Sequence, residues 1–116
     1  MPGLVLFEDD DIITLMSLEN HPLVIPKNHI KDIYTLDVGT GEKIIEQLVR
    51  TSNAIKKGLQ CDGVYITQAN EAAAGQHVFH IHFHVRPRWL GQPMDLTKEA
   101  GMDERKITLE KIKAAF

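Results

Sequence analysis

The segment that decides the fold runs from Gln76 to Arg88 and reads Gln-His-Val-Phe-His-Ile-His-Phe-His-Val-Arg-Pro-Arg. Three of its histidines, His80, His82 and His84, alternate with aromatic or branched residues. Such an alternation predicts a β-strand, on which every second side chain points to the same face. We therefore expect one polar face that carries three imidazoles and an opposite apolar face that packs on the core.

Three alternating histidines favour a functional site, because burying three imidazoles without partners would cost about 1–3 kcal/mol for each ring. One alternative is a zinc site, since His-x-His on a strand suits this metal and a third histidine completes a catalytic set. The other is catalysis on phosphorus, in which one neutral histidine attacks while its neighbours fix the tautomer and bind oxygens. The turn with Asn70, Gly75 and Gln76 favours phosphorus, because its N–H groups can bind anionic oxygens.

Length and composition limit the class of protein. A chain of 116 residues suits one domain, residues 1–116, with its own hydrophobic core. It is 43% hydrophobic and 25% charged, as globular proteins are, and no apolar run reaches the ~20 residues of a membrane span. The net charge of −3 argues against bulk electrostatic binding to nucleic acid. A single cysteine and the lack of a signal-peptide pattern predict a cytoplasmic location.

The rest of the chain predicts four more strands and two helices. The predicted strands are residues 4–7, 12–18, 23–25 and 64–67. Apolar residues recur at spacings of three and four from 40 to 59, which is typical of an amphipathic helix lying across a sheet. A single helical turn is expected within 30–36, and a last helix near Asp103, where acidic residues favour a helix N-terminus. That last helix is expected to dock on the domain edge or on a partner subunit.

Two segments resemble the signature of the histidine triad superfamily. The run from His80 to Val85, with Ala-Gly-Gln at 74–76 and Pro-Arg at 87–88, is similar to the triad block. The run from His21 to His29, His-Pro-Leu-Val-Ile-Pro-Lys-Asn-His, is similar to a second family block. Two blocks in the family's order are more specific than a triad alone.

The resemblance implies an α+β domain with a five-stranded antiparallel sheet, and a homodimer whose long helices pack together. By the match of motifs, His82 is the nucleophile that takes a nucleotidyl group and forms a phosphohistidine, which water then resolves. His80 and His21 are implied to orient and polarise it, and His84 to contact phosphate oxygens or the bridging atom. The step requires no metal and no other cofactor.

The resemblance also implies that Asn70, Gly75 and Gln76 hold the substrate phosphate. His77 stands where relatives often carry Ser or Thr; it could protonate a leaving group if the chain bends before Val78, and otherwise it is a core or surface residue. The ribose-binding acid of relatives is missing, which leaves Ser17 or Glu19 as the candidate ribose contact.

The function implied is hydrolysis or nucleotidyl transfer at the α-phosphate of nucleoside phosphoramidates or dinucleoside polyphosphates. Two alternatives stay open at this point. One is a module that binds nucleotides or a partner protein with little catalysis, and the other is a zinc-dependent enzyme that uses the face of His80, His82 and His84.

Overall fold

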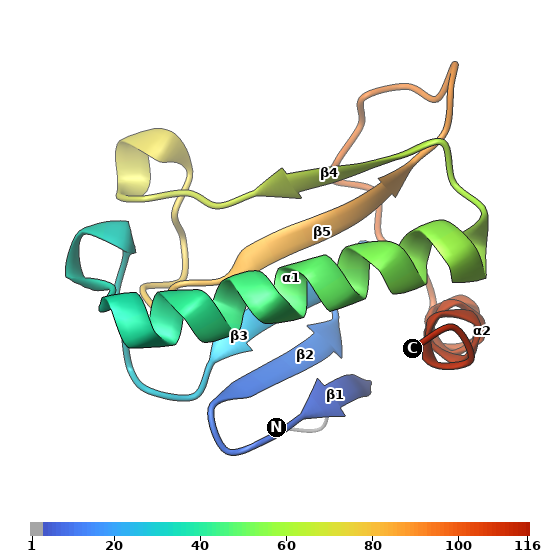
Figure 1. Ribbon diagram of the computed structural model, residues 1–116. Coiled ribbons are helices and arrows are strands. Elements are labelled where there is room, and N and C mark those ends of the chain that lie inside the picture. The colour runs from blue at the N-terminus through green and yellow to red at the C-terminus, as the bar shows by residue number, and fades with distance from the viewer. Residues whose placement is uncertain (1–3) are drawn as a thin grey trace.

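Five antiparallel strands form one sheet in the computed structural model, which describes residues 4–116 (Figure 1). Their order across the sheet is β1-β2-β3-β5-β4. The strands are β1 Val5–Glu8, β2 Ile12–Met16, β3 Pro22–Pro26, β4 Gly63–Thr67 and β5 Phe83–Arg88. The predicted α+β class and the five-stranded antiparallel sheet are confirmed. The single domain predicted for residues 1–116 includes residues 1–3, which lie outside the described part, and stays a prediction.

One long helix, α1, spans Val38–Leu59 and lies across one face of the sheet (Figure 1). It begins two residues before the predicted start, because the Asp37 carboxylate accepts a hydrogen bond from the Thr40 N–H and caps the first turn. Its apolar stripe packs against Val24 of β3 and Val85 of β5, both fully buried. Since side chains alternate across a strand, Leu23 and His84 must point to the opposite, uncovered face.

The strand predicted from Gln76 is wrong for residues 76–82, because β5 begins only at Phe83. The buried Gln76 amide donates to the carbonyls of Lys31 and Val78, and its oxygen accepts from the Glu71 N–H. The Ile81 N–H donates to the carbonyl of residue 30 at 2.7 Å. These bonds hold 76–82 in an irregular path, so only His84 of the three alternating histidines lies in regular sheet.

The last helix, α2, spans Met102–Lys113 and packs on α1 and β1. The side chain of Arg105 is buried and donates to the carbonyls of Met16 and Ser17, at 3.2 and 2.9 Å. The helix thus docks on its own domain, and the predicted contact with a partner subunit stays a prediction. The predicted single turn is the 3₁₀ turn η1 at Ile33–Thr35, and a second such turn, η2, spans Ala72–Ala74.

Among residues 4–116, we find no helix with both the length and the apolar character needed to cross a membrane. The cytoplasmic location stays a prediction.

Candidate active site

Three imidazoles form a row on the sheet face that α1 leaves open. His21, directly before β3, places its Nε2 2.8 Å from Nδ1 of His84 on β5. The ring of His84 in turn stands against the ring of His82, with centroids 5.2 Å apart. The row therefore runs His21, His84, His82, and it joins two segments that are 63 residues apart in the chain.

The backbone carbonyl of His80 determines which ring nitrogen of neutral His82 carries the proton. Its Nδ1 lies 2.9 Å from the carbonyl oxygen of His80. A carbonyl can only accept, so this bond requires the proton on Nδ1 and leaves a lone pair on Nε2. An imidazole in this tautomer has a nucleophilic nitrogen without any need for a separate base.

The side chain of His80 turns away from this row. Its Nε2 lies 2.7 Å from the carbonyl oxygen of Pro26, and its ring meets that of His29 edge-on at 5.5 Å. The expectation that three imidazoles share one face is therefore wrong, because the chain is not a strand at His80. Across residues 4–116, no group of three or more His, Cys, Asp or Glu side chains is placed to hold a metal ion.

Ser17 extends the row on its far side. Its side chain is buried, with 7% of the residue exposed, and its hydroxyl lies 3.2 Å from Nδ1 of His21. The same oxygen also accepts the backbone N–H of His21 at 3.4 Å. Ser17 is held in this position because Arg105 binds its carbonyl. The Ser17 hydroxyl is thus engaged with His21, and its predicted role as a ribose contact stays a prediction.

The inner two histidines are kept neutral by their surroundings. Burial lowers the pKa of His21 to about 3, and the nearby charges of Arg86 and His84 add to the effect. Burial also lowers the pKa of His84 to about 4, with further contributions from Arg86 and His82. Both rings are uncharged at neutral pH, so each carries one N–H donor and one nitrogen acceptor.

In the loop predicted to bind phosphate, the side-chain amides of Asn70 and Gln76 form hydrogen bonds within the protein. Every polar atom of the Gln76 side chain is engaged inside the loop, so its amide is not free for a substrate. The Asn70 oxygen accepts the Ile33 N–H at 2.8 Å, and its amide nitrogen donates to Gln68. Gly75 ends η2 with a φ of +97°, which favours glycine. His77 is exposed on the loop, and its predicted role, like that of Asn70 and Gly75, stays a prediction.

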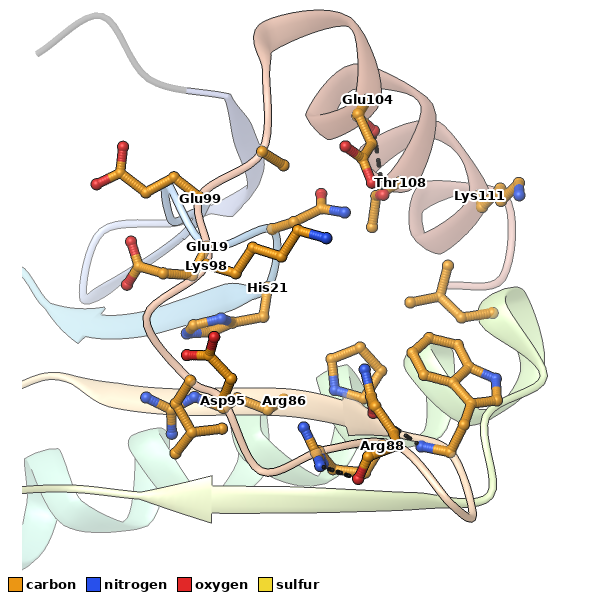
Figure 2. Close-up of a pocket in the computed structure, with 17 residues that line it drawn as sticks. Glu19, His21, Arg86, Arg88, Asp95, Lys98, Glu99, Glu104, Thr108 and Lys111 are labelled. Carbon is orange, nitrogen blue, oxygen red and sulfur yellow. Dashed lines mark hydrogen bonds between the residues drawn. The ribbon is translucent and has the colours of Figure 1, made fainter.

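Arg86 is a functional candidate that the sequence analysis did not identify. Its guanidinium is half-buried next to His21 and His84, and it donates to the Thr67 hydroxyl. The signal was present in the sequence, because a period of two continues from His84 to Arg86 and places both on one face. Arg86 and His21 also line a cavity of about 430 Å³ beside the row (Figure 2).

Comparison with known proteins agrees with this geometry. A family model described as "HIT domain" matches residues 2–89. The crystal structure of a Hit-like protein involved in cell-cycle regulation from Bartonella henselae is 33% identical, with a TM-score of 0.94 over 100% of this chain and 88% of that one. A zinc-bound histidine triad family protein from Mycobacterium smegmatis is 30% identical, with a TM-score of 0.85 over 99% of this chain and 84% of that one.

Among curated proteins, the adenylylsulfatase HINT3 of Arabidopsis thaliana is 33% identical over 91 residues, which are 75% of this chain and 46% of that protein. The family model, the two solved structures and this relative all point to one family. The chain belongs to the histidine triad family.

Proposed function

We propose that this protein cleaves nucleotide substrates at the α-phosphate, with nucleoside phosphoramidates or dinucleoside polyphosphates as the substrate class. Histidine triad proteins are in general nucleotide hydrolases and transferases, and one relative is an adenylylsulfatase. The observation that carries the proposal is the bond from His82 Nδ1 to the carbonyl of His80. It presents Nε2 of His82 as an unprotonated nucleophile.

The proposed reaction has two steps. In the first, the lone pair of His82 Nε2 forms a bond to phosphorus, the P–N or P–O bond to the leaving group breaks, and the leaving group takes a proton from solvent water. The imidazole gains positive charge as this bond forms, and the His80 carbonyl stabilises that charge by accepting a hydrogen bond from Nδ1–H. In the second step, water attacks the phosphohistidine and releases the nucleoside monophosphate, which restores neutral His82.

The row beside His82 is proposed to supply a hydrogen-bond donor for the phosphoryl oxygens. A Ser17 hydroxyl that donates to His21 Nδ1, followed by His21 Nε2–H donating to His84 Nδ1, satisfies all three groups. The proton of His84 then lies on Nε2 and is available to the substrate. If His84 instead donated to His21 and His21 donated to Ser17, the Ser17 hydroxyl proton would need another acceptor. Ser17 is too buried for a water molecule to be that acceptor.

The test measures release of nucleoside monophosphate from a nucleoside 5′-phosphoramidate that carries a fluorescent amine. We expect His82→Asn to lower kcat by at least 10³-fold, because it removes the nucleophile. The matched control is His29→Asn, which removes an imidazole outside the row. A covalent nucleotidyl adduct on His82, seen by mass spectrometry after acid-free quenching, would support the intermediate. Wild-type turnover by His82→Asn would refute the proposal.

Binding with little turnover is the second candidate function. The observation in its favour is the burial of Ser17, which leaves the usual ribose-binding position without a carboxylate. Calorimetric binding of a nucleoside monophosphate by wild-type protein, with no release of amine from any phosphoramidate tested, would favour this candidate over catalysis.

We also infer a homodimer, as the family resemblance implies. Three apolar side chains of α1 are exposed, Val38, Ile45 and Val49, with exposed fractions of 79%, 60% and 55%. The edge strand β4 adds the exposed side chains of Tyr65 and Ile66. Such a surface is typical of a protein interface. Sedimentation equilibrium should give twice the 13.1 kDa chain mass, and Ile45→Glu should yield monomer; a monomeric wild type would contradict the inference.

A further inference from the structure

Arg86 is a half-buried cation whose hydrogen-bonding capacity is only partly used. Within residues 4–116 the ion pairs are Lys27 with Glu8 and Lys43 with Asp11, so no carboxylate lies within ion-pair distance of Arg86. One of its terminal nitrogens donates to a threonine hydroxyl, and its Nε is buried without a partner. A guanidinium has five N–H donors in a planar fork that matches a phosphate, sulfate or carboxylate group. The guanidinium also lies over the Tyr65 ring, 5.9 Å from its centroid, so an anion in ion-pair contact is the partner it lacks.

The position of Arg86 connects it to the proposed chemistry. It follows His84 at a period of two within β5, so these two side chains lie on one face of the strand. Arg86 and His21 line the same cavity, whereas His82 is not part of its lining. A group held in that cavity by Arg86 is thus separate from the phosphate attacked by His82, and close enough to belong to the same substrate.

A built cavity adjoins the guanidinium. It holds about 430 Å³ between the loop of Glu19 and Asn20, the segment 92–100 and α2, as Figure 2 shows with His21 and Arg86 on one side and Thr108 on another. The segment is fixed at both ends, because Arg88 binds the carbonyls of residues 92 and 93 and the N–H of residue 100 donates to the carbonyl of residue 18. The volume suits a small organic ligand.

The charged side chains that line the cavity indicate which other functional groups the ligand would have. Four acidic and four basic side chains line the cavity, and the Glu19 carboxylate lies close enough to Arg86 to raise its pKa, against the lowering that burial causes. Acidic side chains accept hydrogen bonds from hydroxyl or ammonium groups. The cavity therefore suits a ligand that combines one anionic group, at Arg86, with such donors elsewhere.

We propose that Arg86 and this cavity form a subsite for a second anionic group of the substrate, a phosphate, sulfate or carboxylate several atoms beyond the phosphorus attacked by His82. The inference rests on the proposed function and names its substrate class more narrowly. The anionic group belongs either to the leaving group or to the nucleoside, and the experiment distinguishes these sources.

The experiment compares three nucleoside 5′-phosphoramidates: one with a neutral amine, one whose amine carries a carboxylate or phosphate, and one with a neutral amine and a 3′-phosphate on the sugar. We expect wild-type protein to favour the second or the third over the first in kcat/KM, and the favoured one identifies the source. Arg86→Gln should reduce that preference about 10–100-fold, mainly through KM. A ratio is used because any effect of Arg86 on the neutrality of His21 and His84 acts on all three substrates alike.

Two further variants separate the roles of charge and geometry from unspecific effects. Arg86→Lys keeps the charge and loses the planar fork, so it should retain an intermediate preference. Lys106→Gln removes an exposed cation outside the cavity and should leave the preference as in wild type. Equal selectivity in wild type and Arg86→Gln would overturn the inference, even with an active enzyme.

If wild-type protein cleaves none of the three substrates, the proposed function fails and the subsite is still testable. The measurement is then calorimetric binding of inorganic pyrophosphate. At least tenfold weaker binding to Arg86→Gln than to wild type supports the subsite, whereas equal binding, or none to either protein, overturns it.

Discussion

Removing the Ser17 hydroxyl tests the hydrogen-bonded row at its buried end. In Ser17→Ala the Nδ1 nitrogen of His21 loses its partner at 3.2 Å. Only 3% of His21 and 7% of Ser17 are exposed, so bulk water cannot replace the hydroxyl. An unsatisfied buried acceptor costs about 1–3 kcal/mol. For a chain of this size we expect Tm to fall by roughly 4–12 °C.

The same change should alter catalysis through the tautomer of His84. Without the serine proton, His21 can carry its own proton on Nδ1 and accept from His84 through Nε2. His84 then spends part of its time with its proton on Nδ1, where the substrate cannot use it. We expect kcat to fall about tenfold, the equivalent of one ordinary hydrogen bond, with little change in KM.

Three measurements check this reasoning: thermal unfolding, steady-state kinetics on a nucleoside phosphoramidate, and ¹⁵N NMR of the imidazoles, which distinguishes Nδ1–H from Nε2–H. The matched control is Ser52→Ala, which removes a hydroxyl of α1 that has no hydrogen-bond partner among the described residues and lies outside the cavity. The reasoning is refuted if Ser17→Ala shows the wild-type tautomer of His84 and wild-type kcat. A loss of stability alone would reduce Ser17 to a structural residue.

Two further predictions concern stability. His21 and His84 have pKa values of about 3 and about 4 in the folded protein, below the ordinary value of 6.5, so the unfolded chain binds more protons than the folded one as pH falls below about 6.5. The free energy of unfolding should therefore fall toward acid pH, by up to about 1.4 kcal/mol per pH unit from His21 alone. Gly58→Ala should destabilise the protein by at least about 1 kcal/mol, because the new Cβ would lie 2.4 Å from the Lys111 carbonyl oxygen, which outweighs the better helix propensity of alanine.

Each of these predictions has its own control. The acid loss of stability should shrink in His21→Asn relative to wild type over the same pH range, and an unchanged slope would show that other groups cause it. Gly41→Ala places alanine in the same helix, 3.7 Å from the Leu36 side chain, which is ordinary contact, and should be neutral or stabilising. Equal effects of Gly58→Ala and Gly41→Ala would contradict a close approach of α1 and α2.

The neutral row and the cationic Arg86 have complementary chemistry. Arg86 helps to hold His21 and His84 uncharged, so the charge on this face is concentrated in one guanidinium. An anionic substrate is then bound by Arg86 while the histidines stay available as hydrogen-bond donors and nucleophile. A protonated row would instead compete for the anion and block the attack of His82.

Much of the fold and part of the site could be predicted from the sequence. A helix spacing of three and four residues placed α1, and short apolar runs placed four strands, because these patterns repeat within one element. The two family blocks, around His21 and around His82, identified the family. Secondary structure elements and family motifs depend on residues a few positions apart, so a single sequence is enough to predict them.

Only the tertiary structure decided how the polar groups pair. Strand β5 begins only at Phe83, because the buried Gln76 amide and the Ile81 N–H form hydrogen bonds with the carbonyls of residues 31 and 30. The His80 ring binds the carbonyl of Pro26, 54 residues away in the sequence. The buried Ser17 hydroxyl lies against Nδ1 of His21. Nε2 of His21 in turn binds His84, 63 residues further along the chain. Hydrogen-bond partners at such separations follow from strand register and helix docking, which local patterns do not specify. The sequence by itself therefore determined the family and the residues proposed to carry the chemistry, and the packed structure decided which of these residues bind one another.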